Sequence, residues 1–566
     1  MRLAIFLGAE AEWFPLTPGL VQAVFGPDTC IAVNPSVWTN VESAANAAAW
    51  LRNTGAQLLV HALRPDDEYA SALVCEISDG HITGVAALTT PVHEYHVAEN
   101  EREICDCYAG TFIPAANTAS DYAFKLQDSS DVRVLITVGS EPFFVEYQGA
   151  SPRMFFVASV EVADLDAPAG DNWAVEAFSR LVPYAMAIRA VFGTACWRPG
   201  APQATIVVDD PLLNSRYGFL RYDKLLAMTR EHNFHVALAF IPYNYRRTSA
   251  DVVQMFRANS DRLSLCIHGN DHTDAEFAER SEPVLRSLLR IALGRTEVLT
   301  RTTGLACDRI MVFPQGRFSV EAMAELRAMN FDAVVNTVVH PHGSSIKLTL
   351  GEVAQPAVLR YGGFPLFLRR SCSNTRVAEI AFCFFFGRPV FIVEHHEIFK
   401  EPSPMVEAVK RINAVAPRVR WNRLAEVVSH VQLHRIEDDG IRHVRVWARR
   451  AAVENTATVH ARCLVEWMCP NASHSVEEVL ESDSMPIPFI ADDAGARVEI
   501  DVALGGSLYI SLVHRTPPVQ PAAFDARHSA RTFVRRRLSE TRDNYLSRSP
   551  RALAVAKYLQ KKLRFK

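Results

Sequence analysis

Three short clusters of carboxylate and imidazole side chains occur in the middle of this chain, and each follows an apolar run. They are Asp209-Asp210 after Ala204–Val208, His268-Gly-Asn-Asp-His272 after Leu263–Ile267, and Glu394-His395-His396-Glu397 after Val390–Val393. An acid that closes an apolar strand is costly to bury unless it has partners. One polar strand end is ordinary, but three of them between residues 209 and 397 predict side chains that converge on one site.

These residue types suit metal-assisted hydrolysis. His268 and His272 are four residues apart, a common chelate spacing. One carboxylate, two imidazoles and an open position form a catalytic divalent-metal set, with Zn²⁺ the preferred ion. Such a metal polarises a carbonyl and lowers the pKa of bound water. A second carboxylate can act as the general base and a further histidine as the acid. The set therefore predicts hydrolysis of an amide or an ester.

The elements that position these clusters alternate between strand and helix. Trp197-Arg-Pro-Gly-Ala-Pro202 reads as a connector, and residues 203–430 follow it as one α/β unit. Regular alternation predicts a parallel sheet or a (β/α) barrel, whose sites lie at the strand ends. The predicted strands are Ala204–Val208, His235–Phe240, Leu263–Ile267, Ile310–Phe313, Ala333–Asn336 and Val390–Glu394, and the predicted helices are Tyr222–Glu231, Val284–Leu293 and Val320–Met329.

At these residues the chain resembles the polysaccharide deacetylase family, also called carbohydrate esterase family 4 or the NodB homology domain, over about residues 203–430. The resemblance implies a distorted (β/α) barrel. It implies Asp209 as the base, Asp210, His268 and His272 as metal ligands, and His395 as the acid in Val393-Glu394-His395. Pro314 and Gly316, in Phe313-Pro314-Gln315-Gly316, match the groove-wall motif, and Val393 also lines the groove.

The chain departs from the family pattern at several places. Gly269 replaces the family's Ser/Thr, and Val312 stands where the family has the arginine that braces the base. The Trp of the family's fourth motif has no counterpart, because no Trp occurs between Trp197 and Trp421. His396 is the alternative to His395 as the acid. Substrate-side loops are expected at His340-Pro-His342 and at Arg369-Arg370. Tyr243-Asn-Tyr-Arg-Arg247 follows a predicted strand and is a candidate for stacking on a sugar ring.

The expected function is removal of an N-acetyl or related acyl group from a carbohydrate or glycoconjugate, with a divalent metal, Zn by preference. Three alternatives stay open. One is a metal-dependent hydrolase of a small amide that is not a polysaccharide. Another is a non-catalytic glycan-binding or assembly protein. The third is a glycoside hydrolase with Asp209 and Glu394 as its paired carboxylates, which leaves the two histidines without a role.

The regions on either side of this unit show different sequence patterns. Residues 1–197 read as an α/β domain of unknown role, with strands at Leu3–Leu7, Leu58–Val60 and Val134–Val138 and βα turns at Gly8 and Gly139. No dinucleotide-binding or P-loop glycine motif occurs. Residues 432–525 alternate with period two, which predicts an antiparallel β-sandwich, and residues 526–566 read as a basic helical tail.

Composition and charge indicate which partners and which cellular compartment to expect. The 566 residues are 49% hydrophobic and 22% charged, with a net charge of −4, which gives no support for a nucleic-acid binder. Eleven cysteines without a Cys-x-x-Cys pair, and an apolar start too short for a signal peptide, predict a cytoplasmic protein. Residues 531–566 carry 12 Lys and Arg against two acids. This tail is expected to form an amphipathic helix, with its stripe at Ala552, Val555, Ala556, Leu559 and Leu563. It would lie either on the protein's own acidic body or on an anionic membrane.

Overall fold

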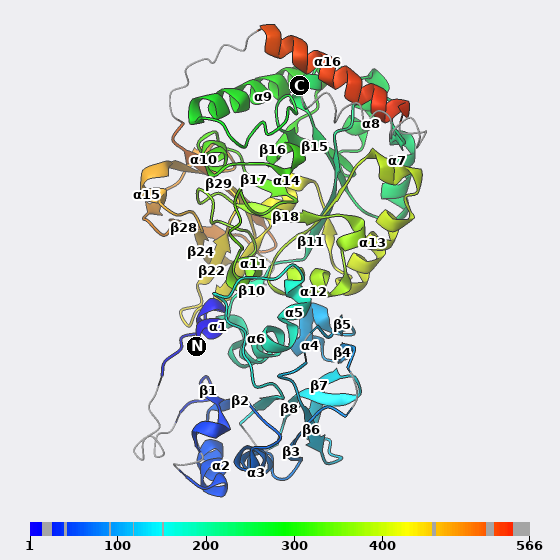
Figure 1. Cartoon of the computed structure of the whole chain (residues 1–566). Coiled ribbons are helices and arrows are strands. Elements are labelled where there is room, and N and C mark those ends of the chain that lie inside the picture. The colour runs from blue at the N-terminus through cyan, green and yellow to red at the C-terminus, as the bar shows by residue number, and fades with distance from the viewer. Residues whose placement is uncertain are drawn as a thin grey trace.

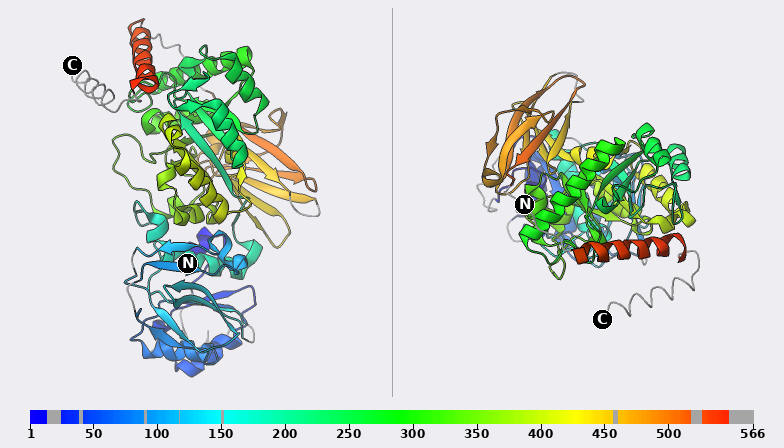
Figure 2. Two further views of the ribbon diagram at one scale, coloured as in Figure 1. Left: turned by 90° about the vertical axis from the view of Figure 1, so that its right-hand side faces the viewer. Right: turned by 90° about the horizontal axis from the view of Figure 1, so that it is seen from above.

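The computed structural model describes residues 1–13, 25–38, 42–89, 92–116, 118–149, 152–455, 460–516 and 526–546. A central barrel carries an N-terminal α/β unit at one end, a pair of C-terminal sheets on its side and a single helix, α16, at the end away from the N-terminal unit (Figure 1). The arrangement of the two C-terminal sheets beside the barrel is clearest in Figure 2.

Seven parallel strands form the barrel, in the order β14-β15-β16-β17-β18-β19-β11, and β11 pairs back with β14 to close it. The predicted (β/α) barrel is therefore confirmed. The strands are β11 (Gln203–Asp209), β14 (Val236–Phe240), β15 (Leu263–His268), β16 (Cys307–Val312), β17 (Ala333–Asn336), β18 (Leu366–Arg370) and β19 (Val390–Glu394). The short β20 (Arg420–Trp421) pairs with the start of β11.

Strand β18 was absent from the sequence prediction, and the expectation of a loop at Arg369-Arg370 is wrong. The segment pairs with β17 and β19 in parallel register. Only its first three residues, Leu366-Phe-Leu368, are apolar, two arginines follow them, and Gly362, Gly363 and Pro365 precede them, so the local pattern favours a loop. Hydrogen bonding to the neighbouring strands β17 and β19 stabilises this segment as a strand instead.

A helix follows each barrel strand, either directly or after further turns. They are α7 (Tyr222–Glu231), α8 (Ala250–Ala258), α9 (Glu282–Thr303), α10 (Val320–Ala328), α11 (Leu350–Ala354), α12 (Val377–Phe385) and α13 (Ser403–Val415). The helix predicted at 284–293 extends a further ten residues to Thr303, and it ends at Gly304, which adopts a left-handed conformation. A hairpin of β12 (Arg216–Tyr217) and β13 (Leu220–Arg221) lies between β11 and α7.

Alternation along the strands separates the inside of the barrel from the outside. One buried cluster fills the interior, with Val207, Ala239, Cys266, Val312 and Phe391 among its members. Helix α14 (Leu424–Ser429) contributes Leu424, Val427 and Val428 to this cluster. Every second strand residue therefore faces this core, and polar residues at the carboxyl ends of the strands continue the same faces.

The N-terminal unit is α/β, as predicted, around a mixed sheet in the order β1-β2-β9-β8-β7-β4-β5. Its strands are β1 (Cys30–Val33), β2 (Gln57–Val60), β9 (Met154–Val157), β8 (Glu141–Tyr147), β7 (Val132–Val138), β4 (Glu94–Val97) and β5 (Phe112–Pro114), with β3 (Ile82–Ala86) and β6 (Ala123–Leu126) as a separate pair. The helices are α1 (Arg2–Phe6), α2 (Ala44–Asn53), α3 (Glu68–Ile77), α4 (Arg102–Cys105), α5 (Trp173–Glu176) and α6 (Phe178–Phe192).

Two local predictions in this unit are wrong. The apolar run predicted as a strand at 3–7 forms helix α1, because a short apolar run fits either structure and packing decides between them. Consequently Gly8 does not stand in a βα turn. Gly139 joins the antiparallel strands β7 and β8 rather than a strand and a helix. The unit contacts α12 of the barrel, where Arg189 Nη1 donates a 2.7 Å hydrogen bond to the Phe385 carbonyl.

The C-terminal region contains two sheets, in the orders β10-β21-β22-β24-β28-β27 and β23-β29-β25-β26. Their strands are β10 (Arg198–Pro199), β21 (Gln432–Ile436), β22 (Arg442–Val446), β23 (Arg450–Glu454), β24 (Ala461–Trp467), β25 (Val476–Glu481), β26 (Met485–Pro486), β27 (Ile490–Ala491), β28 (Ala496–Val502) and β29 (Ser507–His514), and the short helix α15 (Ala472–Ser475) precedes β25. The prediction of an all-antiparallel arrangement needs one correction, because β22 and β24 pair in parallel.

Helix α16 (Ala526–Asn544) is the described part of the basic tail, and it lies on the barrel. The apolar stripe predicted at Ala552–Leu563 lies outside the described residues. Among the described helices, none is both long and apolar enough to cross a bilayer.

Candidate active site

Asp209 is the last residue of β11, and alternation carries its side chain toward the barrel interior. Val207, two residues earlier, belongs to the interior cluster, as do Cys266 and Phe391 on β15 and β19. His268 stands two residues after Cys266, and His395 stands four residues after Phe391. The two-residue period of the strands thus places Asp209, His268 and His395 on inward-facing positions at the carboxyl edge of the barrel.

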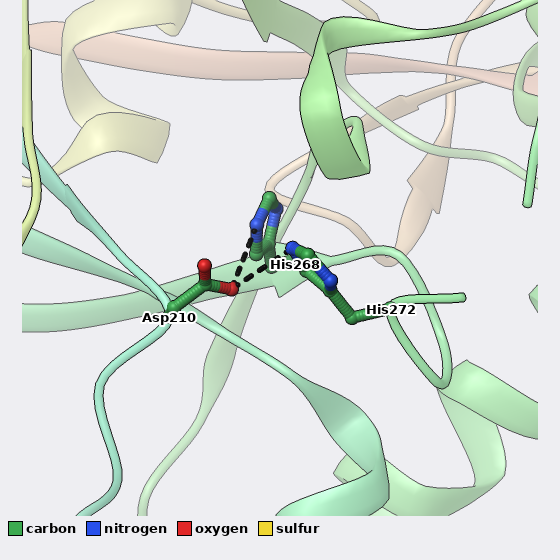
Figure 3. A group of neighbouring side chains, drawn as sticks. All are labelled: Asp210, His268 and His272. Carbon is green, nitrogen blue, oxygen red and sulfur yellow. Dashed lines mark ion pairs between the residues drawn. The ribbon is translucent and has the colours of Figure 1, made fainter. Parts of the chain in front are cut away.

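Asp210 needs a different explanation, because simple alternation would point it outward. Its φ of 67° breaks the strand, and the chain turns at this residue. The turn brings Asp210 Oδ1 to 3.3 Å from His268 Nε2 and 3.0 Å from His272 Nε2 (Figure 3). The three donor atoms all lie within 4.8 Å of one another, which is the spacing of ligands around one ion.

The protonation of His268 tests whether this group fits a metal. Its Nδ1 lies 2.8 Å from the Val312 carbonyl, which can only accept a hydrogen bond, so Nδ1 carries the proton. In the neutral ring Nε2 then has a lone pair, directed at the carboxylate of Asp210. Asp210 Oδ1 is buried and has no hydrogen-bond partner within the described part of the chain. Two imidazole nitrogens and a carboxylate oxygen that face one another need protons or a cation between them, and the residue types and spacing of this set fit a divalent metal.

The electrostatics around Asp210 favour its ionised form. Burial acts to raise the pKa of Asp210, but the positive charge and hydrogen bonds that His272 and His268 supply when they are protonated outweigh burial and hold the pKa well below its usual value. A bound cation would supply that positive charge with both imidazoles neutral. A carboxylate, rather than a carboxylic acid, is the form that binds a metal.

A buried glutamate that the sequence analysis missed holds the loop between the two histidines. Glu276 accepts backbone N–H hydrogen bonds from Asn270 (3.1 Å), Asp271 (2.8 Å) and His272 (3.1 Å). Burial raises the pKa of Glu276 above its usual value, although these hydrogen bonds oppose the shift. Three backbone bonds to one carboxylate fix the path of the loop and therefore the position of His272.

The same loop explains why the family's Ser/Thr is replaced by glycine here. Gly269 has a φ of 64°, a conformation that residues with a β-carbon rarely adopt. A β-carbon at 269 would also clash with the ring of Pro314 and with the carboxylate of Glu276. Pro314 and Glu276 thus occupy the space that a side chain at 269 would need.

Asp209 is paired with an arginine from a strand that the sequence analysis did not predict. Arg369 Nη1 and Nη2 donate to Asp209 Oδ1 and Oδ2 at 2.6 and 2.7 Å, and both side chains are buried. Burial alone would raise the pKa of Asp209. The charge of Arg369 outweighs it, with smaller contributions from His268 and His395, and lowers the pKa below its usual value. Val312, where the family has its bracing arginine, is buried in the interior core instead. The arginine that pairs with Asp209 in this chain is Arg369, on β18.

The two candidate acids face different surroundings. His395 is exposed at the end of β19, and its charge lowers the pKa of Asp209, so it lies within electrostatic reach of that carboxylate. His396 is buried under α16. Its ring packs edge-on against Tyr217 at 5.4 Å between centroids, and its Nε2 lies 3.7 Å from Asp543 Oδ1. The location of His395 near Asp209 therefore favours it over His396 as the acid. His396 instead packs between the barrel and α16, where it contacts Tyr217 and Asp543.

The remaining predicted residues lie around the same edge. Pro314 and Gly316 are buried in a tight turn after β16, and Val393 is buried on β19. Tyr243 follows β14, and its backbone N–H donates to the Asn270 carbonyl at 3.0 Å, so it borders the histidine loop. Glu394 accepts a 2.8 Å hydrogen bond from the Cys372 N–H. It lies one residue out of phase with His395, so alternation turns it away from the interior register of Asp209.

No family model matches, and no curated protein matches. Among solved structures, one from Mycobacterium smegmatis assigned to the polysaccharide deacetylases matches with 14% identity and a TM-score of 0.29, over 42% of this chain and 94% of that one. A family 4 carbohydrate esterase from Streptomyces lividans, in complex with acetate, matches with 10% identity and a TM-score of 0.25, over 38% and 90%. A family 4 acetyl xylan esterase from Clostridium thermocellum, with a cobalt ion, matches with 13% identity and a TM-score of 0.22, over 37% and 81%.

Proposed function

We propose that this protein is a divalent-metal-dependent hydrolase that removes an N-acetyl or related acyl group from a carbohydrate or glycoconjugate. The observation that carries the proposal is the convergence of Asp210, His268 and His272 beside a second carboxylate, Asp209, at the carboxyl edge of the barrel. A purely structural cluster would not need to direct two imidazole nitrogens at one buried carboxylate oxygen, at 3.3 and 3.0 Å.

Asp210 Oδ1, His268 Nε2 and His272 Nε2 would hold the metal, and one carboxylate with two imidazoles favours Zn²⁺. When bound, the ion polarises the acyl carbonyl and lowers the pKa of a water molecule at its open position. The protein keeps these ligands ready through the Val312 carbonyl, which fixes the tautomer of His268, and through Glu276, which fixes the loop that carries His272.

Asp209 would accept a proton from the attacking water at its carboxylate. Arg369 keeps that carboxylate ionised and oriented, since it occupies both oxygens through donated hydrogen bonds. His395, exposed at the same edge, would donate a proton to the leaving nitrogen or oxygen. The carbohydrate part of the substrate is inferred from the motifs shared with the deacetylases at these same residues.

Metal content and acetate release test the proposal together. The full-length protein should contain about one Zn²⁺ per chain by elemental analysis. It should also release acetate from N- or O-acetylated sugars. Asp209→Asn and His395→Ala should each lose about 10²–10⁴-fold in turnover and keep the metal. His272→Ala should lose the metal as well. His430→Ala is a matched histidine control, because His430 pairs with Glu454 outside the site and its loss should leave turnover unchanged.

The outcomes separate the alternatives. Metal without acetate release from any acylated sugar would favour a small amide as substrate, or a binding protein if no amide is cleaved either. Equal metal content in wild type and His272→Ala would contradict the ligand assignment. Turnover that is unchanged in Asp209→Asn would contradict the mechanism. Loss in His396→Ala but not in His395→Ala would move the acid by one residue.

A further inference from the structure

Helix α16 contacts the barrel through its polar side, which is the reverse of an ordinary surface helix. Its buried side chains are polar or charged: Thr532, Arg536, Glu540 and Asp543. They stand at i, i+4, i+8 and i+11, which is one face of the helix. Specific polar contacts, rather than burial of apolar surface, therefore dock this helix on the barrel.

The polar contacts are made to loops at the carboxyl edge of the barrel. Tyr217 donates its hydroxyl to Asp543 Oδ2 at 2.6 Å, and the Gly218 N–H donates to Asn544 Oδ1 at 2.8 Å. Arg247 Nη2 donates to Glu540 Oε2 at 2.7 Å. These partners lie in the loops after β11 and β14. The helix therefore lies at the carboxyl edge of the barrel, the edge at which Asp210 follows β11.

The outward side of α16 is apolar. Val534 is 55% exposed, Leu538 65% and Tyr545 70%. With Thr541 they stand at i, i+4, i+11 and i+7, so they form one stripe, and the exposed Phe533 borders it. A helix that turns its apolar stripe away from its own protein has that stripe available for another surface.

Charge identifies the kind of surface. The exposed charged side chains next to the stripe are Arg531, Arg537 and the half-exposed Arg542. Arg537 and Arg542 also pair with Glu540 and Asp543 of the same helix, whereas Arg531 is the arginine that stands on the stripe itself. The two acids of the helix, Glu540 and Asp543, are both buried against the barrel. An apolar stripe flanked by arginines is the pattern of a helix that lies in the interface of an anionic membrane.

The same charges argue against two other segments as the partner of this stripe. Residues 547–566 contain seven Lys and Arg and no acid, so folding that segment onto the stripe would bring like charges together. A second copy of α16 packed on the stripe would also bring arginines close to arginines. Anionic lipid has the opposite charge and attracts both the helix and the segment that follows it.

We infer that the outward face of α16, formed by Val534, Leu538, Tyr545 and Arg531, docks this protein on an anionic membrane surface. The helix lies at the far end of the molecule from the N-terminal unit, where no other described element covers it (Figures 1 and 2). Because α16 rests on the carboxyl-edge loops, docking would hold the edge that carries the metal-ligand cluster close to the lipid headgroups.

Vesicle sedimentation of the full chain tests the inference. Wild type should sediment with vesicles of phosphatidylcholine and phosphatidylglycerol, should not sediment with phosphatidylcholine alone, and should be released by salt. Leu538→Asp should weaken the binding at least about ten-fold, and Arg531→Gln about five-fold. Ile490→Asp is the matched control, because Ile490 is 66% exposed on the C-terminal sheets, and it should bind as wild type does. Circular dichroism should be the same for all variants, since each changed side chain points outward.

Four results would overturn the inference. The first is absence of binding by wild type, and the second is binding by Leu538→Asp that equals wild type. The third is loss of all binding in a chain ending at Leu546 while Leu538→Asp is unaffected, which would assign the membrane contact to residues 547–566. The fourth is a wild-type dimer, seen by light scattering, that Leu538→Asp converts to a monomer without any vesicle binding, which would make the stripe a contact between copies.

Discussion

Removing Arg369 should destabilise the barrel and change the titration of Asp209. In Arg369→Met a side chain of similar length fills the space, but the Asp209 carboxylate stays buried without its cation. Asp209 is 5% exposed and Arg369 2% exposed, and two hydrogen bonds of 2.6 and 2.7 Å join them. Loss of one partner from such a buried pair costs about 3–5 kcal/mol of folding free energy.

The cost should depend on pH in a defined direction. With Arg369 present, the folded-state pKa of Asp209 lies below its usual value, so the pair stabilises the protein above that value and the contribution is lost as pH falls through the folded pKa. Without Arg369, burial is left to raise the pKa of Asp209 above the unfolded value, so the variant loses stability as pH rises. The difference between wild type and Arg369→Met should therefore be larger at pH 7 than at about pH 4.5.

Urea denaturation at the two pH values measures the difference, and the double variant Asp209→Asn/Arg369→Met is the key comparison. Removing both charges should recover most of the lost stability. Arg449→Met, which breaks the ion pair with buried Asp332 at the other edge of the barrel, should also destabilise. It should leave the pH profile of kcat/KM unchanged, whereas Arg369→Met should move its acidic limb to higher pH. Equal destabilisation by the single and double variants at both pH values would refute this account of the pair.

Three further substitutions test the parts that position the site. Glu276→Leu leaves three backbone N–H groups without their acceptor, so Zn²⁺ affinity should fall about 10–100-fold in a metal-competition titration; unchanged affinity would mean that the loop needs no such support. Gly269→Ala should also weaken metal binding, because a β-carbon at φ 64° would meet Pro314, and normal Zn²⁺ retention would contradict that packing. Gly218→Ala should loosen α16, since its β-carbon would enter the His396 ring, and faster proteolytic release of the helix would show it.

The inward register of the site could be predicted from the sequence because it depends on strands with clear patterns. Apolar runs before Asp209, His268 and Glu394 are long enough to be recognised as buried strands, and period two then sets which residues face the core. Residue types and the spacing of His268 and His272 predict one carboxylate and two imidazoles as metal ligands, and the resemblance to the deacetylase family implies that the carboxylate is Asp210. Each of these inferences uses only neighbours along the chain.

Other features depend on contacts between segments far apart in sequence. Asp210 reaches the two histidines only because its φ is positive, which local pattern does not reveal. Arg369 reaches Asp209 across 160 residues from a strand that its neighbours stabilise. The run at 3–7 is a helix because of what it packs on, since its sequence suits either structure.

For this protein, the sequence pattern by itself predicted an α/β unit with a parallel sheet or a barrel, the three polar strand ends and the chemistry that their side chains support, because strand alternation and ligand type are local properties. The choice of a barrel came from the resemblance to the deacetylase family. Only the tertiary structure decided which arginine pairs with Asp209, which of His395 and His396 is buried under α16, and which face of α16 points outward. The helix shows the physical reason: its composition specifies an amphipathic helix, but the partners Tyr217 and Arg247, some 300 residues earlier in the chain, bind its acids and so turn its apolar stripe toward solvent.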